Sequence, residues 1–276
     1  MRLINPLANN EGGWGLYNSL TNTPIYRDVS DLLLIGISHK DFGGKKFDTK
    51  LFEFKRRLRS LDHLAFEGRQ NTHEVNGSTG ANTYEQAAYK HFRGQKHYLD
   101  EGTNYSKAVE KYGVSKDLFI LLNALRDLKV ATSKTDGDLL KKIESGLEFK
   151  KEIYFGSDEV DIQKIMDTVA TFLVNVLSNI HDNLPACLAA QEAFFEYMPR
   201  IRDYEVYAPE IKKIQTAFNG KKGAILGANH IDYLCGILSD EIKTPPPQWK
   251  ELFEEMDDEA KKGVMLLEDF ISRQKV

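Results

Sequence analysis

Three short apolar runs in this chain each end beside a side chain that can do acid–base or metal chemistry. The run 31–36 ends at a glycine and is followed three residues later by His39; the run 223–227 has the same form and is followed by His230. A third apolar run ends at Glu67. Two imidazoles and a carboxylate can bind a divalent metal with open positions for water, or can act as bases and acids without one. We therefore treat these three residues as candidates for one site.

Four further charged residues are candidates for an additional part of this site. Asp100 and Glu101 end a fourth strand-like run, Arg69 follows the glutamate of the third run, and Glu85 lies in the first turn of an expected helix. Each also has a structural explanation. Paired carboxylates suit a solvated turn, an arginine can neutralise a neighbouring carboxylate, and an acidic residue stabilises the first turn of a helix. A single histidine after a strand also has a structural explanation, and it is the recurrence at several strand ends that favours a shared site.

The runs 31–36 and 223–227 have the length and apolar content of buried strands, and the third and fourth runs are strand-like. Between them, apolar residues at helical spacing in 47–58 and a capping-box pattern, Thr83-Tyr-Glu-Gln86, predict helices. Strands that alternate with helices form βαβ units, whose right-handed crossovers make the strands parallel and place their carboxyl ends at one edge of the sheet. We therefore expect an α/β protein with a parallel-sheet core, and a site at that edge.

Helical patterns alone occupy roughly a hundred residues after this first half of the core. The stripe at Ile162, Ile165, Val169, Phe172, Val176 and Ile180 predicts a long buried helix in this part. We expect a large all-helical insertion and a helical C-terminus. The expected segments are 1–105 and 201–243 for the two halves of the α/β core, 106–200 for the insertion and 244–276 for the C-terminal helices.

Composition limits the class of protein. The chain has 276 residues and a formal net charge of −4, so it can bury a sizeable core but lacks the basic field that nucleic-acid binding normally needs. The first residues do not resemble a secretory signal, and the apolar passage 169–180 is interrupted by polar residues, so we expect no membrane span. Cys187 and Cys235 have no metal-binding or redox spacing. These features favour a cytoplasmic protein.

Four short motifs, in this order along the chain, resemble those of a known superfamily. They are Gly36-Ile-Ser-His39, Phe66-Glu67-Gly-Arg69, Arg202-Asp203 and Gly227-Ala-Asn-His230. The superfamily includes the TraB/PrgY, Tiki/GumN, ChaN and erythromycin-esterase proteins. The resemblance covers roughly residues 31–101 and 200–240, and the helical middle would be its variable insertion. This chain differs from Tiki and many TraB-type proteins because it has no expected membrane span.

The resemblance implies an α/β core with an active site at the carboxyl edge of the sheet. Tiki proteins are described as metal-dependent proteases, the esterases use a histidine and glutamate centre, and ChaN binds haem. Carried over by motif, His39 and His230 match the two Gly-x-x-His histidines, Glu67 matches the glutamate at the strand end, and Arg202 matches the late arginine.

We expect a protease- or esterase-like hydrolase acting on a small-molecule or peptide substrate. His39, Glu67 and His230 would bind Mn, Zn, Co or Fe, or would activate water themselves, and Arg202 would stabilise negative charge on the substrate. One alternative is a non-catalytic protein that binds haem or another small ligand. Another is an interaction protein whose helices dock a partner while the site is vestigial.

Overall fold

The computed structural model describes residues 24–37, 48–70, 83–131, 144, 148, 151–152, 154–156, 158–177 and 180–274. Contacts divide the chain into two compact units. The α/β unit comprises the described residues of Ile4–Glu101 and Arg202–Pro245, and the helical unit comprises those of Gly102–Ile201 and Pro246–Val276.

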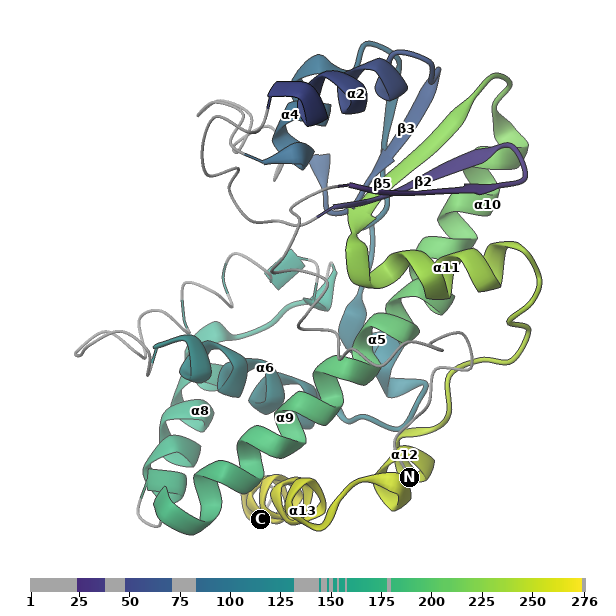
Figure 1. The fold of residues 1–276 in the computed structure, drawn as a ribbon. Coiled ribbons are helices and arrows are strands. Elements are labelled where there is room, and N and C mark those ends of the chain that lie inside the picture. The colour runs from purple at the N-terminus through teal and green to yellow at the C-terminus, as the bar shows by residue number, and fades with distance from the viewer. Residues whose placement is uncertain are drawn as a thin grey trace. The chain divides into compact units, whose positions relative to one another are not determined.

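A five-stranded mixed sheet forms the centre of the α/β unit (Figure 1). The strands are β1 (Ile25–Val29), β2 (Leu32–Ile37), β3 (His63–Phe66), β4 (Gln95–Tyr98) and β5 (Lys222–Gly227), in the spatial order β1-β2-β5-β3-β4. All neighbouring pairs are parallel except β1 with β2. Every residue of β2 and β5 is buried, which explains their continuous apolar runs. The prediction of an α/β chain with a mainly parallel sheet is confirmed.

Helices cover both faces of the sheet within this unit (Figure 1). Side chains alternate along β2: Leu33 and Ile35 belong to the core with α2 (Asp48–Leu58) and α4 (Tyr84–His91). Leu32 and Leu34 belong to the core with α10 (Ala208–Ala217) and α11 (Ile231–Leu238). The period of two in a strand produces this division. The sheet is therefore a rigid layer between two apolar cores.

Local signals set the ends of these elements. Helix α4 begins with the predicted capping box, in which the Thr83 side chain accepts a hydrogen bond from the Gln86 N–H and the Gln86 side chain accepts one from the Thr83 N–H. Strand β1 lies in a stretch for which no strand was predicted. It pairs with β2 across a tight turn in which Ser30 has a φ of 55°. Its burial pattern, with two exposed charged residues, is that of an edge strand.

The carboxyl ends of β2, β5 and β3 meet at one edge of the sheet. In the parallel registers, Ile37 lies opposite Gly227, and Phe66 lies opposite Ile225. Glu67 directly follows β3, and β5 is followed by the short helix η3 (Ala228–His230). This arrangement places the strand-end residues of β3 and β5 on neighbouring strands.

The helical unit contains α5 (Tyr105–Glu110), α6 (Lys116–Ala131), α8 (Ile162–Leu177), most of α9 (Ile180–Arg202), α12 (Trp249–Glu255) and α13 (Asp258–Gln274). The predicted stripe on α8 is buried at Ile162, Ile165, Val169 and Phe172, whereas the side chains of Val176 and Ile180 lie outside the described ones. The predicted helical C-terminus consists of two helices, α12 and α13. None of the helices in the described ranges is long and apolar enough to cross a lipid bilayer.

Candidate active site

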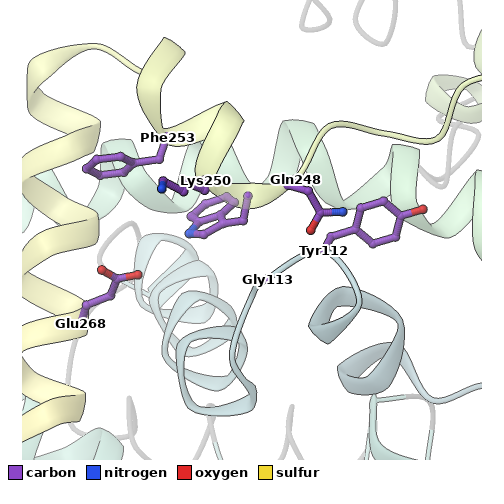
Figure 2. Close-up of a pocket in the computed structure, with 7 residues that line it drawn as sticks. Tyr112, Gly113, Gln248, Lys250, Phe253 and Glu268 are labelled. Atoms are coloured by element: carbon purple, nitrogen blue, oxygen red, sulfur yellow. The ribbon is translucent and has the colours of Figure 1, made fainter.

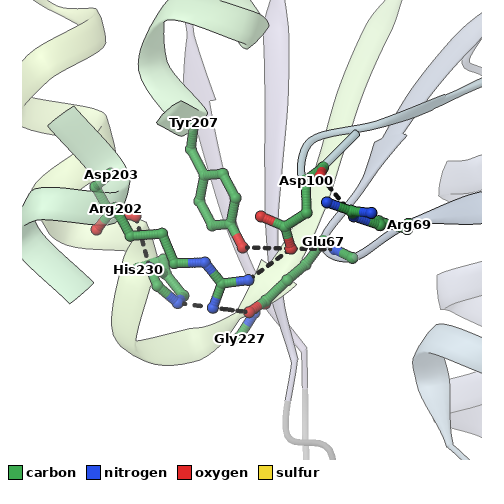
Figure 3. Close-up of polar contacts among 9 residues, drawn as sticks. Glu67, Arg69, Asp100, Arg202, Asp203, Tyr207, Gly227 and His230 are labelled. Carbon is green, nitrogen blue, oxygen red and sulfur yellow. Dashed lines mark hydrogen bonds and ion pairs between the residues drawn. The ribbon is translucent and has the colours of Figure 1, made fainter. Parts of the chain in front are cut away.

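Glu67 lies at the centre of a polar cluster at the carboxyl edge of the sheet (Figure 3). Its Oε2 accepts a hydrogen bond of 2.7 Å from the backbone N–H of Gly227. Its Oε1 lies 2.9 Å from Nη1 of Arg202 and 3.7 Å from Nε2 of His230. The first contact ties the end of β3 to the end of β5. The others join the glutamate to two side chains that are distant in sequence.

His230 forms a buried pair with Asp203. The Nδ1 of His230 lies 2.6 Å from Oδ1 of Asp203, and the two residues are only 3% and 1% exposed. Because a carboxylate accepts hydrogen bonds, this contact assigns a proton to Nδ1 and leaves Nε2 facing Glu67. The Tyr207 ring packs edge-on against the imidazole, with ring centroids 5.3 Å apart. The imidazole is thus fixed in tautomer and in orientation.

The charges of this pair are coupled. Burial raises the pKa of Asp203 to about 6, although the neighbouring His230 opposes the rise. For His230, burial is the largest single influence and acts to lower the pKa, but Asp203 and Glu67 together outweigh it. The pKa of His230 is therefore raised above its ordinary value. The two groups titrate as a pair that holds a proton near neutral pH.

Asp100 is the second carboxylate bound by Arg202. It is fully buried, and its Oδ2 accepts hydrogen bonds from the Gly68 N–H at 2.9 Å and from Nη2 of Arg202 at 2.7 Å. The Tyr207 hydroxyl lies 3.3 Å from the same oxygen. Arg202 thus bridges two carboxylates from neighbouring strand ends. Its guanidinium also stacks on the Tyr207 ring, 4.6 Å from the centroid.

The residues predicted from the sequence fall into two groups. Glu67 contacts both Arg202 and His230, and Asp100 joins them through the arginine. Arg69 is buried beside this group, and its Nε donates a hydrogen bond of 3.1 Å to the Asp100 carbonyl.

Three other predicted residues are not placed in this network. Glu101 is exposed in the turn after β4, and Glu85 lies in the first turn of α4. His39, the third member of the predicted centre, lies outside the described residues.

Asp203 and Tyr207 are site residues for which no role was predicted. The Arg202-Asp203 motif drew attention to this point of the chain, but only the arginine was assigned a function. Asp203 could have been found as a carboxylate in the same motif. Tyr207 had no signal in helical spacing, because it lies five positions after Arg202 and an α-helix places residues at that spacing on different sides.

The described residues do not by themselves form a metal centre. Among the described ranges, no group of three or more His, Cys, Asp or Glu residues has an arrangement that could bind a metal. Glu67 already accepts a hydrogen bond on Oε2 and forms an ion pair with Arg202 through Oε1. With His39 outside the described residues, the metal centre stays a prediction.

A separate cavity of about 260 Å³ lies within the helical unit (Figure 2). It is lined by Tyr112, Gly113, Gln248, Trp249, Lys250, Phe253 and Glu268. Lys250 and Glu268 are exposed charged residues, and the lining contains no histidine or cysteine. The buried cluster around His230 is therefore the stronger candidate for acid–base chemistry.

Comparison with known proteins does not identify a family for this chain. No protein-family model, curated protein or solved structure matches this chain. The motif resemblance to the TraB, Tiki, ChaN and erythromycin-esterase superfamily thus stays a prediction. The geometry of the cluster is therefore the basis on which a function is proposed.

Proposed function

We propose that the α/β unit is a hydrolase in which His230 is the general base and acid. The observation that carries this proposal is the buried Asp203–His230 pair, whose second imidazole nitrogen faces Glu67. A carboxylate bound to Nδ1 holds the imidazole in one orientation and stabilises its protonated form. A structural histidine does not need a buried carboxylate on one side and a second carboxylate on the other.

In the proposed reaction, Nε2 of His230 takes a proton from a water molecule as the water oxygen attacks the carbonyl carbon of an ester or amide. A tetrahedral intermediate forms with negative charge on the former carbonyl oxygen. The imidazolium then gives the proton to the leaving alcohol or amine as the bond to carbon breaks. Asp203 stays ionised and stabilises the imidazolium during both transfers.

Glu67 and Arg202 are the most exposed side chains of the cluster. Their side chains are 13% and 19% exposed, whereas Asp100 and Asp203 are almost completely buried. We assign to Arg202 the stabilisation of negative charge on the substrate, because a cation near a developing oxyanion lowers the barrier. Glu67 holds this guanidinium and keeps it close to His230.

A metal-dependent form of the same hydrolase would need His39 as an additional ligand. The superfamily resemblance supports that form, as it supports an α/β core interrupted by a large helical insertion between its two halves. Elemental analysis of protein purified without a histidine tag separates the two forms: stoichiometric Mn, Zn, Co or Fe favours the metal-dependent one. A haem absorption band would favour the ligand-binding alternative.

The function is tested by hydrolysis of chromogenic esters and peptide amides by the wild type, His230→Gln and Asp203→Asn. We expect His230→Gln to lower kcat about 10²–10⁴-fold, the usual range for a general acid–base group. His63→Gln is the matched control, because His63 is a partly buried histidine at the opposite end of β3. Activity equal in all four proteins would refute the assignment.

The pH profile gives a second readout. Since the base must be neutral and the pKa of His230 is raised, kcat/KM should increase with pH through a pKa above about 6.5. In Asp203→Asn the anion that raises this pKa is gone, so the profile should move to lower pH. An unchanged profile would contradict the role given to Asp203.

A further inference from the structure

The helical segment that supplies Arg202, Asp203 and Tyr207 contains a turn of π-helix. Residues Asp203–Tyr207 form η2, and the N–H of Ala208 donates to the carbonyl oxygen of Asp203, five residues earlier. The backbone at Arg202 and Ala208 stays in the right-handed helical region, so one turn is widened without a break in the helix. Such π-turns are rare and are often found at functional sites.

The widened turn changes which side chains share a face. In an α-helix of about 3.6 residues per turn, side chains five positions apart point about 140° away from each other. With bonding between residues five apart, positions 202 and 207 lie nearly one above the other. The stacking of the Arg202 guanidinium on the Tyr207 ring, 4.6 Å from its centroid, reports this alignment.

All three side chains converge on the strand-end residues (Figure 3). Arg202 contacts Glu67 and Asp100, and Asp203 contacts His230. Tyr207 reaches Asp100 through its hydroxyl and packs its ring on His230. A regular helix could direct Asp203 and Tyr207 to one side, but Arg202 would then point away from Tyr207.

We propose that the extra residue of this π-turn lets Arg202, Asp203 and Tyr207 converge on the strand-end residues and so forms the site. Tyr207 is then a positioning residue that holds Arg202 and Asp100 in place. Tyr207 is fully buried, so it acts through these neighbours and does not contact substrate. The effect of this arrangement on catalysis rests on the proposed hydrolase function. The arrangement of the side chains does not depend on that function.

Deletion of Glu205 tests the π-turn directly. Without one residue the helix can close as a regular α-helix. The following residues are anchored in the apolar core by Ala208, Ile211 and Ile214, so closing the helix should rotate Arg202 and Asp203.

We expect Asp203 to move away from His230 in this deletion variant. In ¹⁵N-histidine NMR spectra of the full chain, the pKa of His230 should then fall relative to the wild type, because only Glu67 is left to oppose the effect of burial.

Two substitutions of Tyr207 test independently whether this residue positions Arg202. This test can be made even if the deletion variant does not fold. Tyr207→Phe keeps the ring that stacks on Arg202 and His230 and removes only the hydroxyl. Tyr207→Leu removes both. We expect the Nε–H resonance of Arg202 to lose its protection from exchange in the leucine variant and to keep most of it in the phenylalanine variant.

These readouts separate the present proposal from the hydrolase proposal, because they need no substrate. A wild-type pKa of His230 in the deletion variant, or equal protection of Arg202 in both Tyr207 variants, would overturn the inference about the π-turn. If the NMR changes occur as expected but the wild type hydrolyses none of the esters and amides, the assembly role stands and the hydrolase assignment fails.

Discussion

Replacement of Arg202 by methionine should strongly destabilise the α/β unit. The guanidinium lies 2.9 Å from Oε1 of Glu67 and 2.7 Å from Oδ2 of Asp100. Asp100 is completely buried and Glu67 is 13% exposed. A methionine fills a similar space but leaves two carboxylates without the cation that neutralises them.

The size of the stability loss depends on the hydrogen bonds that each carboxylate retains. Removing one partner of a buried ion pair costs about 3–5 kcal/mol, because the remaining charge is uncompensated. Asp100 still accepts hydrogen bonds from the Gly68 N–H and the Tyr207 hydroxyl, and Glu67 keeps the Gly227 N–H. We therefore expect a loss at the lower end of that range, about 3 kcal/mol.

Native-state hydrogen exchange is the appropriate assay, since the two units need not unfold together. Exchange of the β5 amides reports the free energy of opening of the α/β unit. Arg273→Met is the matched control: this arginine pairs with Asp269 on an exposed face of α13, where an ion pair contributes about 0.3–0.5 kcal/mol.

A second substitution tests the cause of the loss. In a Glu67→Gln background one of the two uncompensated charges is absent, so Arg202→Met should cost less there than in the wild type. A loss below about 1 kcal/mol in the single variant, or the same loss in both backgrounds, would refute the reasoning from buried charge.

Two further outcomes are expected. Because the pKa values of Asp203 and His230 are both raised, the native state binds protons more tightly than the unfolded chain. The His230 contribution is fully present below about pH 6.5 and is lost as pH rises through its native pKa. Urea unfolding should thus show a larger decrease between pH 6 and 8 for the wild type than for Asp203→Asn, and equal decreases would contradict this. Gly36→Ala should cost about 1–3 kcal/mol in thermal or urea unfolding and lower the activity, since its Cβ would lie 2.5 Å from Ile231 Cγ1, next to His230; an unchanged stability would show that the Ile231 side chain can move away freely.

The sequence was most informative where local physics decides the structure. Continuous apolar runs predicted β2 and β5 to within a residue at each end, because strands buried on both faces leave little room for polar residues. The spatial order of the strands could not be predicted. Insertion of β5 between β2 and β3 depends on contacts between residues more than a hundred positions apart.

Helix ends were predictable only where a capping residue acted locally. The capping box fixed the start of α4, whereas α9 begins at Ile180 and continues through Pro185. Tertiary packing can extend a helix on the N-terminal side of a proline, because the proline disturbs only the preceding turn.

The site was predictable only in part. Strand-end placement identified Glu67 and His230 as neighbours, since parallel strands deliver their ends to one edge. The partner of His230 was not identified, because Asp203 is placed by a π-turn that leaves no periodic signal in the sequence. The same turn hides the relation between Arg202 and Tyr207.

The central position of β5 has a consequence for biosynthesis. Strands β2 and β3 each use one edge to pair with β5, which leaves the ribosome only after the whole helical segment has been made. At about 5–20 residues per second, that interval is roughly ten to thirty seconds. During it, the nascent chain carries apolar strands with open edges, a state prone to aggregation and to capture by chaperones. The segment that finally closes the sheet also brings His230 to Glu67, so the site cannot assemble before this segment has been synthesised.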